Sequence, residues 1–183
     1  LRTAVEIRLA DALFYDEQYI EAAVEYENFR RLHPKNSKAP YALYMYGLSN
    51  FKQAEKLDTD QTPVRNAVNI FESFLKEYPD SALAKEVREK LAECRTRQAA
   101  NEIYVGRFYF RTDRYAAAIG RFREAVEKYP GAPVNDEALF LLGSSYLRTG
   151  KTDLAKDALN RLVKEYPKSA FSDQAKKLLA GIS

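Results

Sequence analysis

Four prolines, Pro34, Pro79, Pro130 and Pro167, set a repeating frame that constrains the fold more than any other feature of this sequence. An alanine stands twelve residues before each of them, and large apolar residues stand mostly eight and five residues before. A small side chain lets two helices cross closely, and a large one beside it fills the remaining space. The frame therefore predicts one kind of helix repeated four times. Its members are Ala22, Tyr26 and Phe29; Ala67, Phe71 and Phe74; Ala118, Phe122 and Ala125; and Ala155, Leu159 and Leu162.

A second set of small residues marks a preceding helix in each repeat. Gly106 and Gly143 lie 24 residues before their prolines, Ala10 takes the same position in the first repeat, and Gly47 lies 32 residues before Pro79. Together the two halves match the 34-residue tetratricopeptide unit. The sequence thus predicts an all-α fold, a tetratricopeptide-repeat superhelix (α-solenoid) of about four repeats with a C-terminal capping helix.

The spacing also predicts where the repeats lie within a single domain over residues 1–183. We expect repeats at about 3–36, 40–80, 99–132 and 136–169, and a cap at 170–181 that starts near Ser172 and stops at Gly181. Eight extra residues in the second repeat fall around EKLDTDQTPV, where Pro63 suits the first turn of a helix. Residues 81–111 lack proline and predict one long helix, capped by Asp80 or Ser81.

Charge is nearly balanced overall, with 29 basic and 26 acidic residues, so the totals do not indicate a nucleic-acid-binding protein. The two halves differ, however. Residues 1–91 have a net charge of −2 and residues 92–183 a net charge of +5. Two interpretations stay open at this point, a solvated repeat surface and a C-terminal docking face for an acidic partner.

The inventory of chemically reactive residues is poor. Cys94 is the only cysteine and His33 the only histidine, and no nucleophile motif, zinc motif or phosphate-binding glycine loop occurs. We interpret Cys94 as a small, partly buried helix residue and His33 as the end of a helix. The sequence predicts no enzyme, no catalytic residue, no metal and no cofactor.

The beginning of the chain and its hydropathy add two expectations. The first residues, LRTAVEIRLADALFY, have an amphipathic helical pattern and no initiator methionine, so we expect a part of a longer protein. No apolar run approaches the roughly 18 residues that span a membrane.

Aromatic residues gather at the positions that line the concave groove in repeats of this class. Such rings suit extended, strand-like peptides of loose sequence, because they bury a large area at a small cost in side-chain entropy. Ordinary packing between repeats is an equal alternative. The candidate peptide-binding residues are Tyr15, Tyr41, Tyr44 and Phe51.

Arg107, Arg111 and Arg148 stand at corresponding groove positions in the second half, and Arg121, on the second helix of the third repeat, adds charge to another face. Guanidinium groups favour paired hydrogen bonds with carboxylates at an interface, whereas a solvated arginine is the simpler interpretation of each one taken singly. The candidate partner-binding residues are Arg107, Arg111, Arg121 and Arg148.

Nearly the whole chain resembles the BamD lipoprotein family of the bacterial outer-membrane β-barrel assembly machinery. The resemblance rests on YALYMYGLSNF, on the insertion with the long helix behind it, and on RFYFRTDRYAAAIGRFREAVEKYP. It implies a five-repeat lipoprotein on the periplasmic face of the outer membrane. The signal peptide, the lipidated cysteine and the first repeat would lie outside this sequence.

The resemblance also implies a function, a non-catalytic scaffold for membrane insertion of proteins. Its N-terminal repeats would receive unfolded outer-membrane proteins, and its C-terminal repeats would dock on the periplasmic domains of a BamA-like barrel subunit, with other assembly lipoproteins as partners. No nucleic acid is implied, and the membrane is reached only through the lipid anchor. Two alternatives stay open, a soluble periplasmic repeat protein of the Tol-associated kind and a regulatory repeat domain of a larger enzyme.

Overall fold

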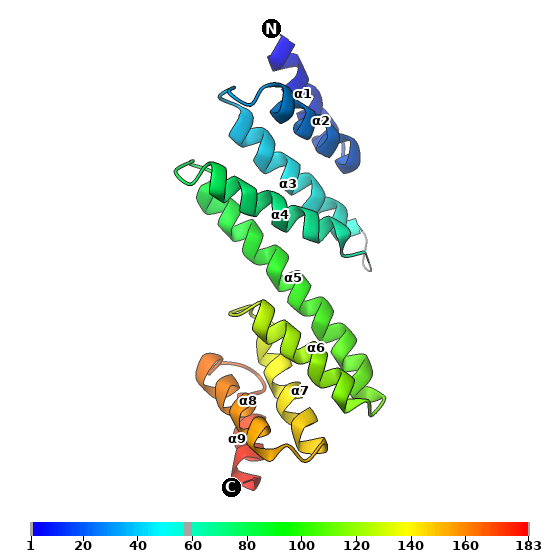
Figure 1. The fold of residues 1–183 in the computed structure, drawn as a ribbon, viewed down its shortest axis with the longest axis vertical. Coiled ribbons are helices and arrows are strands. Elements are labelled where there is room, and N and C mark those ends of the chain that lie inside the picture. Colours follow the sequence, from blue (N-terminus) through cyan, green and yellow to red (C-terminus); the bar gives the residue numbers. More distant parts are fainter. Residues whose placement is uncertain (1, 57–59, 183) are drawn as a thin grey trace. The chain divides into compact units, whose positions relative to one another are not determined.

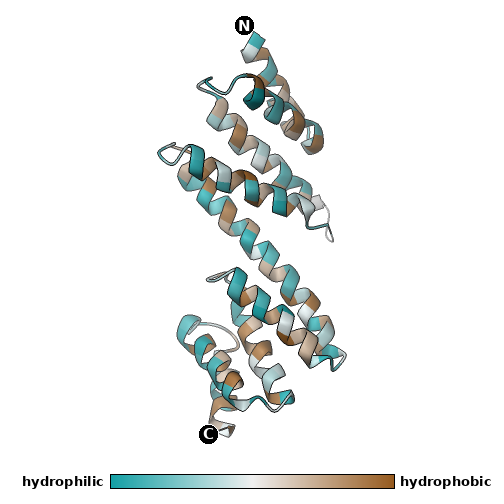
Figure 2. Ribbon diagram, viewed as in Figure 1, coloured by the Kyte–Doolittle hydropathy of each residue, from teal (hydrophilic) through white to brown (hydrophobic). Residues whose placement is uncertain are grey.

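The computed structural model describes residues 2–56 and 60–182, which form nine helices and no strand (Figure 1). Most helices have 14 residues, and hydrophobic and hydrophilic residues alternate along them, as amphipathic helices require (Figure 2). The expected all-α fold of packed helical repeats is confirmed. The helices are α1 Arg2–Tyr15, α2 Tyr19–Leu32, α3 Ala39–Lys56, α4 Thr62–Glu77, α5 Ala84–Arg111, α6 Tyr115–Lys128, α7 Asn135–Arg148, α8 Thr152–Glu165 and α9 Ser172–Gly181.

The chain divides into two compact units, Leu1–Arg95 and Thr96–Ser183. In the first unit α1 packs on α2, α2 on α3 and α3 on α4; in the second, α6 packs on α7, α7 on α8 and α8 on α9. Helix α5 belongs to both, because Val87, Leu91 and Cys94 lie in the core of the first unit and Ala99 and Ile103 in the core of the second. The single repeat domain expected over residues 1–183 stays a prediction.

The repeating frame of small and large residues forms the two cores. All twelve aligned residues before the prolines are at most 2% exposed. The three glycines of the preceding helices each face one of the large residues. A Cβ atom added to Gly47 or Gly106 would lie 2.5 Å from Cε1 of Phe71 or Phe122, and one added to Gly143 would lie 2.7 Å from Cγ of Leu159. The missing side chain is what lets each helix pair approach so closely.

The helix that follows Pro79 begins later than the sequence predicts. The backbone amide of Leu83 donates a hydrogen bond to Ser81 Oγ (3.2 Å), and the amide of Ala84 donates to the Ser81 carbonyl (2.9 Å). This turn occupies residues 81–83, so α5 begins at Ala84 and not at 81. Ser169 forms the same turn before α9, which begins at Ser172, near the predicted start of the capping helix.

The insertion in the second repeat mainly lengthens two helices. Helix α3 has 18 residues and α4 has 16, against 14 in each helix of the first repeat. Pro63 lies in the first turn of α4, as expected, where its missing amide hydrogen leaves no helical hydrogen bond unmade. Residues 57–59, in the middle of the quoted insertion, lie outside the described residues.

Candidate protein-binding surfaces

Two of the four aromatic candidates are buried in the core of the first unit. Tyr44 and Phe51 are 6% and 5% exposed, because the beginning of α5 covers their face of α3. The Tyr44 hydroxyl donates a hydrogen bond to Glu86 Oε1 (2.6 Å), and Lys90 Nζ lies 5.6 Å from the centre of the Phe51 ring. Residues of α5 thus lie against both rings.

Sequence reasoning missed this cover. Glu86 and Lys90 are four residues apart and therefore share one face of α5. That spacing was a signal that the long helix could lie over an aromatic face, because an acid can accept a tyrosine hydrogen bond and an amine can lie over a ring.

The other two aromatic candidates are more accessible. Tyr15 ends α1 with 76% of its surface exposed, and its ring meets Phe14 edge-on at 5.8 Å. Tyr41, at the start of α3, is partly buried, and its hydroxyl donates to Asp11 Oδ1 (2.8 Å). Whether any of the four contacts a peptide stays a prediction.

Asp11 joins three helices of the first unit. Besides Tyr41 of α3, it accepts a hydrogen bond from the fully buried Tyr26 of α2 (2.7 Å). Burial raises the pKa of both phenols. The carboxylate of Asp11 raises it further, because it accepts a hydrogen bond from each protonated hydroxyl. A phenol that stays protonated is a permanent donor, so this cluster fixes Tyr41 at the surface of the unit.

The arginine candidates lie on three helices of the second unit. Arg107 Nη1 lies 3.2 Å from Glu137 of α7, and Arg121 Nη1 lies 3.0 Å from Glu102 of α5. Their side chains are 47% and 42% exposed. Both guanidinium groups therefore keep a solvent-facing side although each already has one carboxylate partner.

Arg111 and Arg148 differ from this pair. The guanidinium of Arg148 lies 5.9 Å from the centre of the Tyr115 ring. Arg111 shares a face of α5 with Arg107, one turn further on, is exposed, and makes no ion pair with any residue that the structure describes. The structure thus brings Arg107 and Arg111 together and leaves Arg121 and Arg148 on other helices. Their partner contacts stay a prediction.

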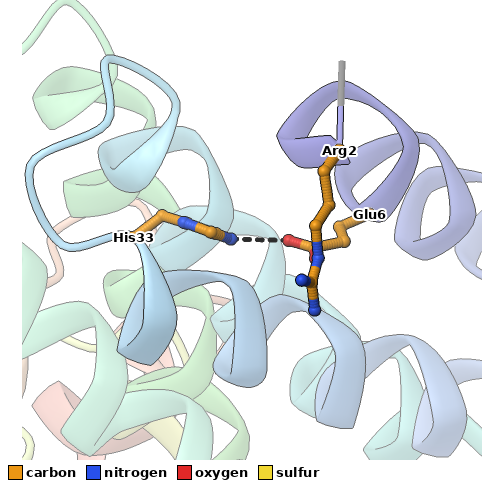
Figure 3. A network of polar contacts seen from close by, with 3 residues as sticks. All are labelled: Arg2, Glu6 and His33. Atoms are coloured by element: carbon orange, nitrogen blue, oxygen red, sulfur yellow. Dashed lines mark hydrogen bonds and ion pairs between the residues drawn. The ribbon is translucent and has the colours of Figure 1, made fainter.

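His33 ends α2 as the sequence predicts, and it ties that helix to α1. Its Nε2 lies 2.6 Å from Glu6 Oε2, and Arg2 Nε donates to Glu6 Oε1 (3.0 Å), so Glu6 lies between the two (Figure 3). The hydrogen bond with His33 lowers the pKa of Glu6. In the described part of the chain no cluster of three metal-ligating side chains occurs, and Cys94 is fully rather than partly buried.

A polar pocket of about 370 Å³ opens near the ends of α2 and α4. Its charged lining residues balance one another, and the ion pair of Arg30 with Glu77 (2.6 Å) runs across it. Such a lining selects no charged ligand. Among the described helices, none is long and apolar enough to cross a bilayer.

Comparison with known proteins places the chain among outer-membrane proteins. The family model "YfiO: Outer membrane lipoprotein" matches residues 2–160. The outer membrane protein assembly factor BamD of Caulobacter vibrioides is 31% identical over 145 residues, which are 79% of this chain and 48% of that protein. The BamD of Rickettsia prowazekii is 32% identical over 151 residues, 82% of this chain and 60% of that protein.

The chain thus spans about half to three fifths of the length of these curated relatives. A solved structure named MamA RS-1 ArsTM double mutant aligns with 98% of this chain and 82% of its own, at 19% identity and a TM-score of 0.35.

Proposed function

Because the chain belongs to the YfiO family of outer membrane lipoproteins, we propose that it is a non-catalytic scaffold in the assembly of outer-membrane β-barrel proteins. The match over residues 2–160 carries this proposal, and the assembly-factor name of its relatives supports it. The same relatives favour this function over a Tol-associated protein or a domain of an enzyme.

The family description also supports a location. The proposed scaffold lies on the periplasmic face of the outer membrane, held by a lipid anchor outside residues 1–183. Its partners would be the periplasmic domains of a BamA-like barrel subunit, other lipoproteins of the complex and unfolded outer-membrane proteins.

The first unit is the proposed substrate-binding part. Tyr15 offers an exposed ring, and Tyr41 presents a ring whose hydroxyl is held by Asp11. A tyrosine ring offers apolar area and one polar atom, which suits strands of varied sequence. Tyr44 and Phe51 would act indirectly. Because they are buried, they would support the residues at the surface rather than contact a ligand themselves.

The second unit is the proposed docking part for the barrel subunit. Arg107, Arg111, Arg121 and Arg148 each keep a solvent-facing side, and residues 96–183 carry a net charge of +5. An acidic patch on the partner could therefore pair with several guanidinium groups at once, which favours association that weakens with salt.

The test is the affinity of this chain for the purified periplasmic domains of the barrel subunit from the same organism, at low and moderate salt. We expect saturable binding that weakens as salt rises. Alanine at the four arginines should lower the affinity and flatten the salt dependence. Arg161→Ala is the matched control, because Arg161 is equally exposed but lies on α8 in a local pair with Glu165.

Two results would speak against the proposal. If the folded chain shows no binding to the barrel subunit at high protein concentration, the scaffold function fails. If binding occurs but the fourfold variant and Arg161→Ala behave alike, the scaffold function stands and the arginine surface is wrong.

A further inference from the structure

One face of α5 exposes two large aromatic rings. Tyr104 and Phe108 are 66% and 51% exposed, and with Arg107 and Arg111 they follow the spacing i, i+3, i+4, i+7 of a single helix face. These four residues are called the α5 stripe below. The opposite face of the same segment holds Ile103 and Gly106, which are buried against α6. Tyrosine and arginine are enriched among the residues that dominate binding at protein interfaces.

On two other helices of the same type, α3 and α7, a neighbouring helix covers the equivalent face, whereas on α1 the equivalent residues Arg8 and Ala12 are exposed. Alignment on Gly47, Gly106 and Gly143 makes Met45 and Ser49 of α3, and Leu141 and Ser145 of α7, the equivalents of Tyr104 and Phe108. Met45 is 4% exposed and both serines are 0% exposed. Helix α2 packs on α3 and α6 packs on α7. A hydrogen bond from Gln53, one turn beyond Ser49, to the Tyr19 carbonyl of α2 (3.3 Å) shows which way this face points.

The long helix explains why α5 lacks such a cover. In α3 and α7 the residues before the aligned helix belong to a separate helix that folds back on it. In α5 those residues continue the same helix, and Val87 and Cys94 are buried in the core of the first unit. The place on α5 that corresponds to the site of α2 on α3 is therefore uncovered. Phe108 stands on this face of α5, where α3 and α7 have the small residues Ser49 and Ser145.

We propose that the α5 stripe is a docking site for one amphipathic α-helix of another protein, with an aliphatic face and carboxylates beside it. A helix is the fitting occupant because helices fill the equivalent positions on α3 and α7. Carboxylates fit because Arg107 keeps a solvent-facing side and Arg111 makes no ion pair within the described residues. This inference shares Arg107 and Arg111 with the arginine surface proposed above, but its test uses a synthetic helix and does not depend on binding to the barrel subunit.

The probe is a synthetic monomeric helical peptide with leucines along one face and glutamates on both sides of them. Fluorescence anisotropy should show saturable binding to the chain. The double variant Tyr104→Ser, Phe108→Ser should weaken it about tenfold or more, because buried aromatic anchors dominate such contacts. Arg111→Ala should flatten its salt dependence. Leu154→Ser is the control, since Leu154 is also exposed in the second unit, at 45%, but lies on α8.

Other results would overturn the inference. The absence of saturable binding would do so, as would equal binding to the double variant. Equally strong binding of a peptide with lysines in place of the glutamates would contradict an acidic partner. Equally strong binding of a peptide with a central proline would contradict a helical partner. Analytical ultracentrifugation could show a dimer of the unaltered chain and a monomer of the double variant. That result would assign the stripe to a second copy of the chain instead.

Discussion

At the scale of single residues, the glycines that face large side chains are the most sensitive positions. Gly106→Ala would place a Cβ atom 2.5 Å from the fully buried Phe122 ring, so the helix pair must move apart. We expect a loss of about 1–3 kcal/mol in the free energy of unfolding, as for other overpacked cores. Urea denaturation monitored by circular dichroism measures it.

The same unit offers a matched control. An alanine at Gly120, inside α6, would meet nothing within 4 Å. Because alanine favours a helix over glycine by up to about 1 kcal/mol, Gly120→Ala should be neutral or stabilising. Equal effects of the two substitutions would mean that close approach of the helices does not explain Gly106.

The buried tyrosines predict a pH dependence. Burial raises the pKa of Tyr26, Tyr41 and Tyr44 above the ordinary 10.0, and Asp11 or Glu86 adds to the increase. Above pH 10 the unfolded chain loses these protons while the folded chain keeps them. The free energy of unfolding should therefore fall as the pH rises above about 10. Below pH 10 the contribution of these phenols is complete and does not change with pH.

Ultraviolet titration of the phenols provides the measurement. The folded chain should show a fraction of its 13 tyrosines that ionises only on unfolding, and Tyr44→Phe should reduce that fraction. The chain in denaturant is the reference. A folded chain whose phenols all titrate together near pH 10 would show that the cluster around Asp11 is open to solvent.

The core residues could be predicted from the sequence, but the candidate site could be predicted only in part. Alanine and large side chains at fixed distances from a proline fit just one helix pairing, and all twelve proved buried. Tyr44 and Phe51 lie at positions that face either a ligand or another helix. The pattern does not show that α5 brings Glu86 and Lys90 over them, and whether either residue also contacts a ligand stays a prediction.

At the scale of elements, three described turns, those between α1 and α2, between α5 and α6 and between α7 and α8, each contain one left-handed residue. Glu17, Asp113 and Gly150 have φ values of 59°, 57° and 72°. A side chain in that conformation costs about 1–2 kcal/mol, a cost that only the glycine avoids. Gly150→Ala should therefore lower the free energy of unfolding by about 1 kcal/mol, measured by urea denaturation.

Gly181→Ala is the control for this turn, because Gly181 lies at the end of α9 without a positive φ and with no neighbour within 4 Å. It should leave stability unchanged or raise it slightly. If Gly150→Ala is equally harmless, the turn relaxes at no cost and the left-handed conformation does not constrain it.

The long helix shows where element prediction from sequence stops. The absence of proline between 81 and 111 and its helical period predicted its existence and its end. Its start depended on whether Ser81 caps the helix or forms a turn before it, and both use the same side chain. The bond from the Leu83 amide to Ser81 Oγ fits either one, and the bond from the Ala84 amide to the Ser81 carbonyl closes the turn, after which α5 begins at Ala84.

At the scale of the whole molecule, the two compact units carry opposite net charges, −2 over residues 1–95 and +5 over residues 96–183. A division at residue 91 gives the same two charges, so the difference does not depend on the exact boundary. A positively charged second unit would attract an acidic partner, which is why the binding tests above compare salt concentrations.

Because α5 contributes core residues to both units, we expect them to unfold together. Thr96 lies in α5 where one unit ends and the next begins. Thr96→Pro removes a helical hydrogen bond and adds a clash, at a cost of about 3 kcal/mol. In repeat arrays cooperativity depends on such nearest-neighbour links. Calorimetry should show one transition for the unaltered chain and two for Thr96→Pro.

Thr152→Pro tests whether the link, and not proline itself, is responsible. Thr152 is the first residue of α8, where a missing amide hydrogen breaks no helical bond, so the variant should keep a single transition. Two transitions in the unaltered chain would mean that α5 does not couple the units. A single transition in Thr96→Pro would mean that contacts other than an unbroken helix hold them together.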